Sequence, residues 1–288
     1  MADVQDRPAD RYRAPALDKG LDILEVLADQ PGGLTRAEIV KALGVSPSQI
    51  YRMLERLVAR AYVTRLDGGD RYALTMKLFL LANGYPPLRR LVAQAQPMMD
   101  AFSRELRQSC HLVVPENGCG IVVAQASPVD HWEFRARVGA RLDLFQTSSG
   151  LTLLAFQDPA RRTETLGQWG IAEAEAAVGA IADQLGRIRR SGHRVGPSGQ
   201  AVGVTDLSVP LLGPRGDAMA VLTCAFIEHP GDPPAGLREA ALARLVERLP
   251  VGLLVHRGDE VLLVRRADNG AWTPVTGIAD PGEEPAVT

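Results

Sequence analysis

Outward-facing polar side chains in the segment 46–60 give the clearest chemical signal in the sequence. The apolar residues of this segment recur at helical spacing and should face a core: Ile50, Leu54, Leu57 and Val58. The opposite face then presents Ser48, Gln49 and Arg52 near the start of the helix. Arg can pair with guanine and Gln with adenine in the major groove of DNA, so this face is a candidate base-reading surface.

Seven residues in and after this segment are candidate DNA contacts: Ser46, Ser48, Gln49, Arg52, Arg56, Arg65 and Arg71. Ser46 should cap the helix, and its hydroxyl could also meet a phosphate. Gln49 either contacts a base or takes part in the capping box. Arg56 either lies toward the DNA backbone or belongs to a solvated face. Arg65 and Arg71 flank a turn and suit a phosphate or minor-groove contact.

A second signal is the loop Thr147-Ser148-Ser149-Gly150, which precedes a helical segment. Its hydroxyl and N–H groups could receive an anion at the helix N-terminus, or Ser149 could simply cap the helix. Three nearby arginines could pair with a carboxylate or lie on the surface: Arg135, Arg137 and Arg141. Three aromatic residues could line a ligand site or belong to the core: Trp132, Phe134 and Phe145.

The cysteines do not predict a metal or redox centre. Cys110, Cys119 and Cys224 are an odd number and lack Cys-x-x-Cys spacing, which argues against a disulfide framework and a structural zinc site. His111 beside Cys110 supplies too few ligands, and a buried cysteine usually acts as a small hydrophobe. No Ser/His/Asp arrangement is visible from spacing. We therefore predict no catalytic residue, no metal and no cofactor.

The elements that carry the first site follow a known order. A helical stripe starts at Pro15 and ends at Pro31-Gly32-Gly33. Two capping boxes follow, Thr35 with Glu38 and Ser46 with Gln49, and each predicts a helix start. YVTRL and RYALT then predict two strands around a turn. Tyr51 could contact a phosphate or pack on the first helix, and packing is the favoured interpretation. This order predicts a winged helix-turn-helix; the alternative is a small helical module without a DNA role.

The remaining segments predict a linker and a second domain. MKLFLLANG is a short apolar helix that ends before Pro86-Pro87, and a longer helix runs from about 88 to 106. Strands are expected at 110–114, 120–124, 132–138, 202–212 and 218–226, and helices at 149–156, 173–190 and 234–249. Hairpins are mixed with crossovers, so the second domain should be α/β with a mainly antiparallel sheet.

Composition excludes several classes of protein. The 288 residues suit about two domains, and 46% hydrophobic residues are ordinary for a globular chain. The net charge of −2 means that any nucleic-acid surface must be local. Because the sequence has neither a run of 18 apolar residues nor the apolar region of a signal peptide, we expect a cytoplasmic protein with no membrane partner.

Residues 15–248 resemble the IclR family of bacterial transcriptional regulators. The resemblance rests on ALDKGLDILEVLA, SPSQIYRMLERLVARAYV and RYALT, and on RARVGARLDLFQTSSGLTLLAF and RRSGHRVGPSGQAVGVTDLSVPLLGPRGDAMAVLTCAF in the second domain. It implies an α+β fold with an N-terminal winged helix-turn-helix, a linker helix and a GAF-like α/β effector-binding domain. It also implies a homo-oligomer, a dimer or tetramer, that binds operator double-stranded DNA and a small molecule, often a carboxylate or aromatic acid.

The resemblance also implies domain limits and effector contacts. The expected domains are a disordered lead-in (1–14), the winged helix (15–76), the linker helix (77–87), the effector-binding and oligomerisation domain (88–249) and a tail (250–288). The implied effector contacts are Ser148, Ser149, Val204, Asp206 and Thr223. Ser149-Gly150-Leu151 departs from the Gly-Lys that the family usually has in this loop. Asp206 would disfavour an anionic effector unless it is paired or protonated.

The tail resembles the start of a Nudix hydrolase. GLLVHRGDEVLLVRRADNGAWTPVTGIADPGEEPAVT resembles a strand pair and the first part of the Nudix box, with Gly277 and Glu283 at the family spacing. Carboxylates that would hold the catalytic metal do not follow. We therefore expect a truncated or fused remnant, with a continuing gene product as the alternative, and we predict that the chain is not an enzyme. The leading hypothesis is a metabolite-responsive transcriptional regulator; the alternatives are a Nudix-type hydrolase fused to a regulator and an oligomerisation module that binds no ligand.

Overall fold

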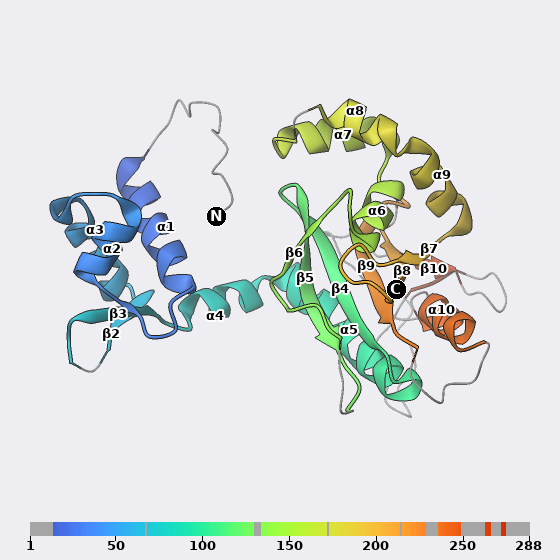
Figure 1. Ribbon diagram of the computed structural model, residues 1–288, viewed down its shortest axis with the longest axis horizontal. Helices are drawn as coiled ribbons and strands as arrows, with labels where there is room; N and C mark the ends of the chain where they lie inside the picture. The colour runs from blue at the N-terminus through green and yellow to red at the C-terminus, as the bar shows by residue number, and fades with distance from the viewer. Residues whose placement is uncertain are drawn as a thin grey trace. The chain divides into compact units, whose positions relative to one another are not determined.

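The chain divides into two compact units that meet at Pro86 and Pro87. The computed structural model describes residues 14–66, 68–129, 134–171, 173–213, 215–228, 236–248, 263–265 and 272–274. The expected lead-in therefore lies outside the described residues except for Ala14, and most of the expected tail does too. Figure 1 shows the course of the chain, and each unit is described below by itself.

The first unit is a winged helix-turn-helix, as the sequence predicts. Its elements are α1 (Pro15–Ala28), β1 (Leu34–Thr35), α2 (Arg36–Leu43), α3 (Pro47–Ala59), β2 (Val63–Arg65), β3 (Arg71–Leu74) and α4 (Lys77–Gly84). The three strands form an antiparallel sheet in the order β1-β3-β2. Ile23, Ile39 and Ile50 are fully buried, one from each of the first three helices, and form the centre of its core.

Local chemistry explains where the helices of this unit begin. The Thr35 hydroxyl accepts the Glu38 N–H at 3.3 Å, and the Glu38 carboxylate accepts the Thr35 N–H at 2.7 Å, which starts α2. Gly33 sits at φ +64°, where a Cβ would lie 2.5 Å from the carbonyl oxygen of Tyr72. The turn that follows α1 can therefore lie this close to strand β3 only with glycine at this position.

The second unit is built on one six-stranded antiparallel sheet. Its strands are β4 (Ser109–Glu116), β5 (Cys119–Ala126), β6 (Arg141–Asp143), β7 (Arg194–Pro197), β8 (Thr205–Leu212) and β9 (Ala218–Phe226), in the order β6-β5-β4-β9-β8-β7. Its helices are α5 (Pro86–Leu106), α6 (Ser148–Ala155), α7 (Pro159–Gln168), α8 (Ala174–Ala180), α9 (Ala182–Ser191) and α10 (Leu237–Arg248). Mixed helices and an antiparallel sheet fit the predicted α+β class.

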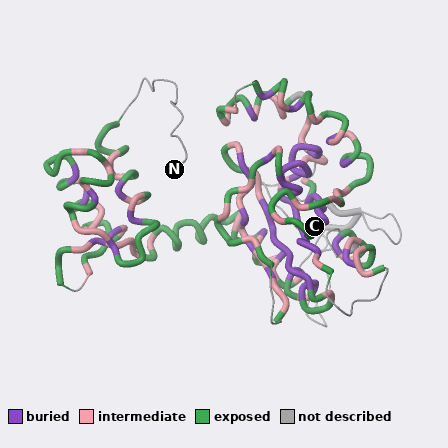
Figure 2. The backbone as a smooth tube through the Cα atoms, viewed as in Figure 1, coloured by how far each residue is buried: buried purple, intermediate pink, exposed green. Residues whose placement is uncertain are grey.

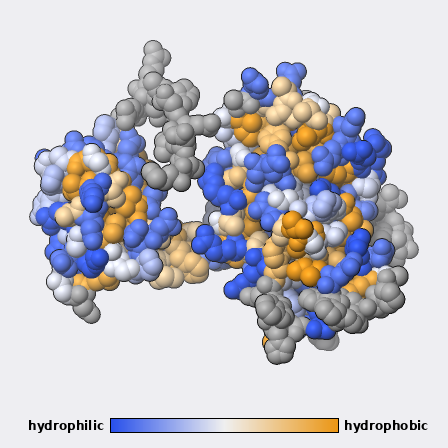
Figure 3. All heavy atoms as spheres, viewed as in Figure 1, coloured by the Kyte–Doolittle hydropathy of each residue, from blue (hydrophilic) through white to orange (hydrophobic). Residues whose placement is uncertain are grey.

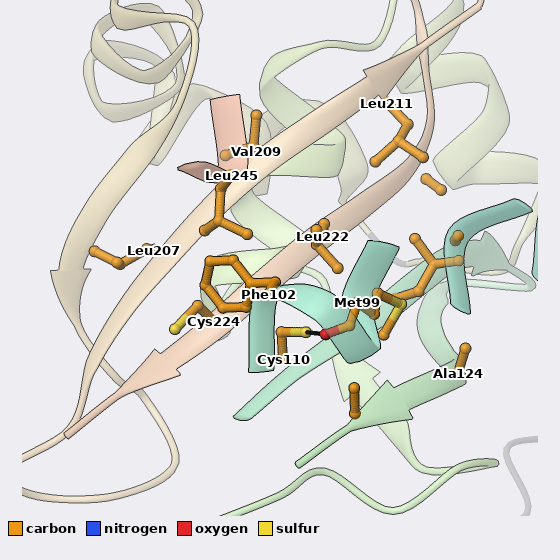
Figure 4. Close-up of a cluster of buried hydrophobic side chains, with 14 of the residues drawn as sticks. Met99, Phe102, Cys110, Ala124, Leu207, Val209, Leu211, Leu222, Cys224 and Leu245 are labelled. Atoms are coloured by element: carbon orange, nitrogen blue, oxygen red, sulfur yellow. Dashed lines mark hydrogen bonds between the residues drawn. The ribbon is translucent and has the colours of Figure 1, made fainter. Parts of the chain in front are cut away.

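The two faces of this sheet support two separate cores (Figure 1). One core packs α5 and α10 on the sheet, and Figure 4 shows Phe102 and Met99 of α5 beside Cys224 and Leu245. The other core packs α6 to α9. Side chains alternate between the faces along a strand, so β8 and β9 contribute apolar residues to the first core and several polar residues to the face under α6.

Several predicted elements of the second unit are wrong. The strand expected at 132–138 is absent from its described part, 134–138, and the edge strand is β6 instead. The single helix expected at 173–190 is two helices, because Ile181 interrupts the helical backbone between α8 and α9. Strand β7 and helix α7 have no counterpart in the expected elements. Pro86 and Pro87 end the linker helix as predicted, but they also form the first turn of α5.

Within the tail the structure describes one short antiparallel pair, β10 (Leu263–Arg265) with β11 (Trp272–Pro274). The rest of the expected Nudix-like segment lies outside the described residues.

Candidate DNA-binding and ligand-binding sites

Helix α3 presents two unpaired arginines on its exposed face. Arg52 and Arg56 are both exposed, and neither side chain has a hydrogen bond or ion pair among the described residues. Ser48 is exposed on the first turn beside them. The buried face of the helix is fixed by Ile50 and Leu54, which have no exposed surface. These arginines are therefore the cations of α3 that an anionic partner can reach without breaking an existing interaction.

The first turn of α3 fixes Gln49 in a structural role. The Gln49 side-chain oxygen accepts the Ser46 N–H at 3.2 Å, which is the capping-box alternative. The Ser46 and Ser48 hydroxyl oxygens lie 3.2 Å apart. A base contact by Gln49 would require it to leave the cap. Direct base contact is therefore better supported for Arg52 than for Gln49.

The arginines of the wing are paired with carboxylates. Arg65 on β2 forms an ion pair with Glu55 of α3. Arg71 on β3 lies 3.0 Å from the Glu38 carboxylate, whose pKa is lowered mainly by the hydrogen bond from the Thr35 backbone. Sequence spacing does not reveal these pairs, because the partners lie ten and 33 residues away. The paired carboxylates partly neutralise both arginines, which weakens their attraction for a phosphate.

Tyr51 lies half-exposed on α3. Its side chain is 47% exposed, and the guanidinium of Arg36 lies 4.9 Å from its ring centroid. The ring is thus half-exposed and stacked under Arg36 of α2, so part of the tyrosine stays accessible on the surface of α3.

The second unit contains a cavity of about 280 Å³ at the N-terminus of α6. Three of the five effector contacts implied by the family resemblance line it: Ser148, Ser149 and Asp206. Val204 is buried and does not line it. Thr223 lies behind the wall, where its hydroxyl oxygen is 2.8 Å from that of Ser149. The volume is near the lower end of the range for small-molecule sites, so it suits a small metabolite.

Thr147, and not Ser149, caps helix α6. The Thr147 hydroxyl accepts the Gly150 N–H at 3.1 Å and donates to the Asp143 carbonyl at 2.6 Å. The capping alternative for Ser149 is therefore wrong. A Cβ on Gly150 would lie 2.4 Å from the Leu144 Cα, so only glycine lets the helix lie this close to the preceding turn. This arrangement leaves Ser148 and Ser149 on the wall of the cavity.

Helix α6 is enclosed along its length. All eight of its residues are buried, and Figure 2 shows them in the interior of the unit. At its far end the Arg162 side chain donates to the Leu154 carbonyl at 3.0 Å, and Arg189 donates to the Ala155 carbonyl at 3.0 Å. These arginines come from α7 and α9 and satisfy carbonyl groups that a helix end leaves free. The helix thus connects the cavity with the outer helices.

A row of hydroxyl groups crosses the sheet beneath α6. Ser208, Thr223 and His111 are direct cross-strand partners on β8, β9 and β4. The Thr223 hydroxyl oxygen lies 2.8 Å from those of both Ser208 and Ser149, and the Ser149 hydroxyl oxygen lies 3.5 Å from His111 Nε2. Burial lowers the pKa of His111 to about 4, so the ring is neutral near pH 7. The row is therefore polar but uncharged.

Asp206 is the acidic group on the cavity wall, and it is 6% exposed. Burial raises the pKa of its carboxyl group, while hydrogen bonds from Ser198 and Ser148 and the charge of Arg194 act in the opposite direction. Arg194 also donates a hydrogen bond to the Ser148 hydroxyl. The carboxylate is thus paired through Ser148 with a cation, which answers the sequence-based concern about an unpaired acid at this position.

The cavity also includes residues that the sequence did not identify as ligand contacts. Ser198 and Gln200 reach it from the loop after β7, and His111 reaches it from β4. Of the three arginines considered for a carboxylate, Arg135 and Arg141 line it. Phe134 also lines it, Phe145 packs on the core under α6, and Trp132 lies outside the described residues.

The cysteines lie in the core. Cys110 and Cys224 face each other across β4 and β9 with almost no exposed surface, and Figure 4 shows both among apolar side chains. Burial raises the pKa of the Cys110 thiol to about 12, so it stays protonated. Among the residues that the structure describes, no group of three or more His, Cys, Asp or Glu side chains could hold a metal.

Two family models match the chain. The IclR helix-turn-helix domain matches residues 16–67, and the bacterial transcriptional regulator IclR C-terminal domain matches residues 88–228. The DNA-binding transcriptional repressor YiaJ of Escherichia coli is 24% identical over 226 residues, which cover 75% of this chain and 78% of the relative. The Pca regulon regulatory protein of Pseudomonas putida is 24% identical over 212 residues, which cover 72% of each chain. These relatives are regulators, and the comparisons give no support to the Nudix-like interpretation of the tail.

Solved structures share the fold. The structure of Pseudomonas aeruginosa HmgR has a TM-score of 0.62 and 24% identity, and the match covers 82% of this chain and 96% of that one. An IclR homolog from Microbacterium hydrocarbonoxydans, complexed with 4-hydroxybenzoate, has a TM-score of 0.62 and 23% identity, with coverage of 80% and 97%. No helix in the described part of the chain is long and apolar enough to span a membrane.

Proposed function

The chain belongs to the IclR family of bacterial DNA-binding transcriptional regulators, and from this we propose that α3 reads its operator and that a small organic acid bound in the second unit controls that binding. The observation that carries the DNA-binding part is the pair of exposed, unpaired arginines on α3, Arg52 and Arg56. The same proposal puts the protein in the cytoplasm, where its operator would be.

Within α3 we propose that Arg52 contacts a base edge and that Arg56 contacts a phosphate. Arg52 lies nearer the N-terminus of the helix, the part that enters the major groove in helix-turn-helix proteins. Arg56 lies one turn further along the same face. Ser46 and Ser48 are close enough to the same end to add phosphate contacts. Arg65 and Arg71 would join as weaker phosphate contacts, because Glu55 and Glu38 partly neutralise their charge.

Fluorescence anisotropy with the DNA upstream of the gene, beside a scrambled duplex, tests this assignment. Arg52→Ala should reduce the preference for the operator by about fivefold or more, because one bidentate base contact is worth about 1–3 kcal/mol. Arg56→Ala should weaken binding to both duplexes and flatten the salt dependence. Arg90→Ala, an exposed position on α5, is the control. An unchanged operator preference in Arg52→Ala would show that α3 reads the operator in another way.

The cavity supports a small organic acid as the effector. Arg135 and Arg141 on its wall supply positive charge for a carboxylate, and Phe134 supplies apolar surface. The related IclR homolog was crystallised with 4-hydroxybenzoate, and another relative carries the name of the Pca regulon. A thermal-shift screen of aliphatic and aromatic carboxylates tests this part, because a ligand that binds only the folded state raises the melting temperature.

Helix α4 supports self-association. It buries none of its residues, and Figure 2 shows it exposed along its length. Phe79 and Leu80 are 56% and 67% exposed, and Leu17 on α1 is 61% exposed. Figure 3 shows apolar surface over α4, which a monomer would leave in water. We propose that a second copy of this chain covers it, giving the dimer or tetramer that the family resemblance implies.

Light scattering after gel filtration tests the assembly. Leu80→Glu should lower the measured mass toward that of one chain, because it places a charge in a buried interface. Lys41→Glu, an exposed site on α2, should leave the mass unchanged. Equal masses for the wild type and Leu80→Glu would argue against α4 as the interface.

A further inference from the structure

Two arginine side chains meet at the C-terminal end of α6. Arg162 of α7 donates to the Leu154 carbonyl at 3.0 Å, and Arg189 of α9 donates to the next carbonyl, that of Ala155, also at 3.0 Å. Burial lowers the pKa of the Arg162 guanidinium, and the charge of Arg189 lowers it further, so the two cations act on each other. Helices α7 and α9 cover the same face of the sheet as α6 (Figure 1). The fold therefore holds two like charges together at one end of a buried helix.

The positive charge of this pair is only partly balanced by the protein. A helix C-terminus carries about −0.5 of an elementary charge, so two guanidinium groups leave an excess of about +1.5. Neither Arg162 nor Arg189 forms an ion pair with the part of the chain that the structure describes. The acids nearest to Arg162 in the sequence have other partners: Asp158 caps the first turn of α7, and Glu164 accepts from the Gln168 side chain at 3.2 Å. Within the described residues, then, no carboxylate contacts the pair.

Each of the two guanidinium groups keeps one edge free. Both arginines bind carbonyls through Nη1, and among the described residues neither uses Nε or Nη2 in a hydrogen bond. This edge can offer two parallel N–H groups to one anion. The Arg162 Nε is buried without an acceptor in the described chain, which is unfavourable for a charged donor. An anion that accepts from this edge would satisfy the donor and also balance the charge.

The space beside Arg162 limits the size of the ligand group. Arg162, Thr165 and Trp169 line a notch with a volume of about 10 Å³. This is room for about one water molecule, and therefore for one oxygen atom of a ligand. A carbon skeleton does not fit in the notch, so the group that enters must be a compact anion.

A phosphate group fits these conditions better than a carboxylate does. A phosphate monoester carries a charge of about −1.5 to −2 near pH 7 and has three acceptor oxygen atoms, which suits the excess charge and the two donor edges. Guanidinium groups also match the geometry of phosphate oxygens. A carboxylate supplies a single charge and two oxygen atoms, so it would leave part of the positive charge unbalanced.

We infer that Arg162 and Arg189 form a second anion site, which binds the phosphate group of inorganic phosphate or of a small phosphorylated molecule. One oxygen atom would accept from the Arg162 Nε and the others from Arg189, while both arginines keep their bonds to α6. The site lies apart from the cavity at the N-terminus of α6, whose lining includes neither arginine. It goes beyond the proposed organic-acid effector and does not depend on it.

Thermal unfolding of the full chain, followed by tryptophan fluorescence, tests the inference. Sodium phosphate and glucose 6-phosphate are compared with sodium chloride at the same ionic strength, so that general screening is equal in the three series. At least one phosphate series should raise the melting temperature with a saturable dependence on concentration, because a ligand that binds only the folded state stabilises it.

The two phosphate series also identify the source of the phosphate group. A larger effect of sodium phosphate would support the free ion as the ligand, and a larger effect of glucose 6-phosphate would support a phosphorylated metabolite. The absence of a saturable rise above the chloride series in both would overturn the inference.

Arg162→Gln and Arg189→Gln identify the residues responsible. Each should weaken phosphate binding about tenfold or more, because charge-assisted hydrogen bonds are lost. Arg187→Gln is the matched control, since Arg187 is exposed and lies about 200° around α9 from Arg189. It should bind phosphate as the wild type does. Wild-type affinity in folded Arg162→Gln and Arg189→Gln, or an equal loss of affinity in Arg187→Gln, would refute the assignment.

Arg141→Gln separates the second site from the cavity. Because Arg141 lines the cavity and not the notch, this variant should keep the wild-type affinity for phosphate. A loss of phosphate binding in Arg141→Gln but not in Arg162→Gln would place the anion in the cavity and refute the second site. If Arg162→Gln does not fold, Arg189→Gln decides alone.

Discussion

Acidification should destabilise the second unit through His111. Burial lowers the pKa of this ring to about 4, whereas a histidine in an unfolded chain has a pKa near 6.5. The unfolded chain therefore binds a proton at a higher pH than the folded one does. The stability that depends on the neutral ring is fully present above about pH 6.5 and is lost as the pH falls toward about 4. Between pH 7 and pH 5 the linkage relation gives a loss of about 2 kcal/mol from this residue.

Neighbouring groups make a matched variant necessary. Asp206 acts with the opposite sign, because a raised pKa in the folded state favours folding as the pH falls. Arg135 and Arg141 share the cavity. His111→Gln removes only the histidine contribution, since Asp206 and the arginines are present in both proteins. The difference between the two pH profiles therefore isolates His111.

Urea unfolding followed by tryptophan fluorescence supplies the measurement. All three tryptophans, Trp132, Trp169 and Trp272, follow Pro87, so the signal reports on the second unit. Between pH 7 and pH 5 the wild type should lose about 2 kcal/mol more free energy of unfolding than His111→Gln. Equal losses of unfolding free energy in the two proteins would mean that burial does not keep the ring neutral. The description of an uncharged row beneath α6 would then be wrong.

Two further perturbations follow from contacts in each unit. Glu55→Gln should release Arg65, so that the protein binds any DNA duplex more tightly and the salt dependence of binding steepens by about one phosphate contact. Anisotropy at several salt concentrations measures this change. The control, Glu25→Gln on α1, should leave the salt dependence unchanged. Gly150→Ala should lower the melting temperature of the second unit, because its Cβ would overlap the backbone at a cost of about 1–3 kcal/mol. Gly179→Ala, in open space on α8, should leave the melting temperature unchanged or raise it. A lower melting temperature for Gly179→Ala than for Gly150→Ala would contradict the packing described for α6.

The winged helix could be predicted because its signals are local. Each capping box places its two partners within one helical turn, and Gln49 shows that the sequence pattern can give the hydrogen bond itself. The wing is different. Its arginines were expected to be available for DNA, but Glu55 and Glu38 come close to them only through the pairing of strands and helices, which residue types alone do not specify.

The residues of the cavity were even harder to predict from the sequence than the ion pairs of the wing. Ser148 and Ser149 could be found because they begin a helix, but Thr147 takes the capping role, since the helix starts at Ser148, two residues earlier than a cap at Ser149 requires. Arg194 reaches Ser148 over 46 residues of chain, and Ser198 and Gln200 follow a strand that the sequence did not predict. Sites of this kind depend on which strands become neighbours, so they appear only with the fold.

Helix α6 has a mechanical consequence for any ligand that enters the cavity. Because all eight of its residues are enclosed, they cannot adjust one at a time when Ser148 or Ser149 is pushed. The helix would instead move as one rigid body and displace the carbonyl groups that Arg162 and Arg189 bind at its far end. Helices α7 and α9 would then report that the cavity is filled, together with strand β9, whose Thr223 hydroxyl already contacts Ser149.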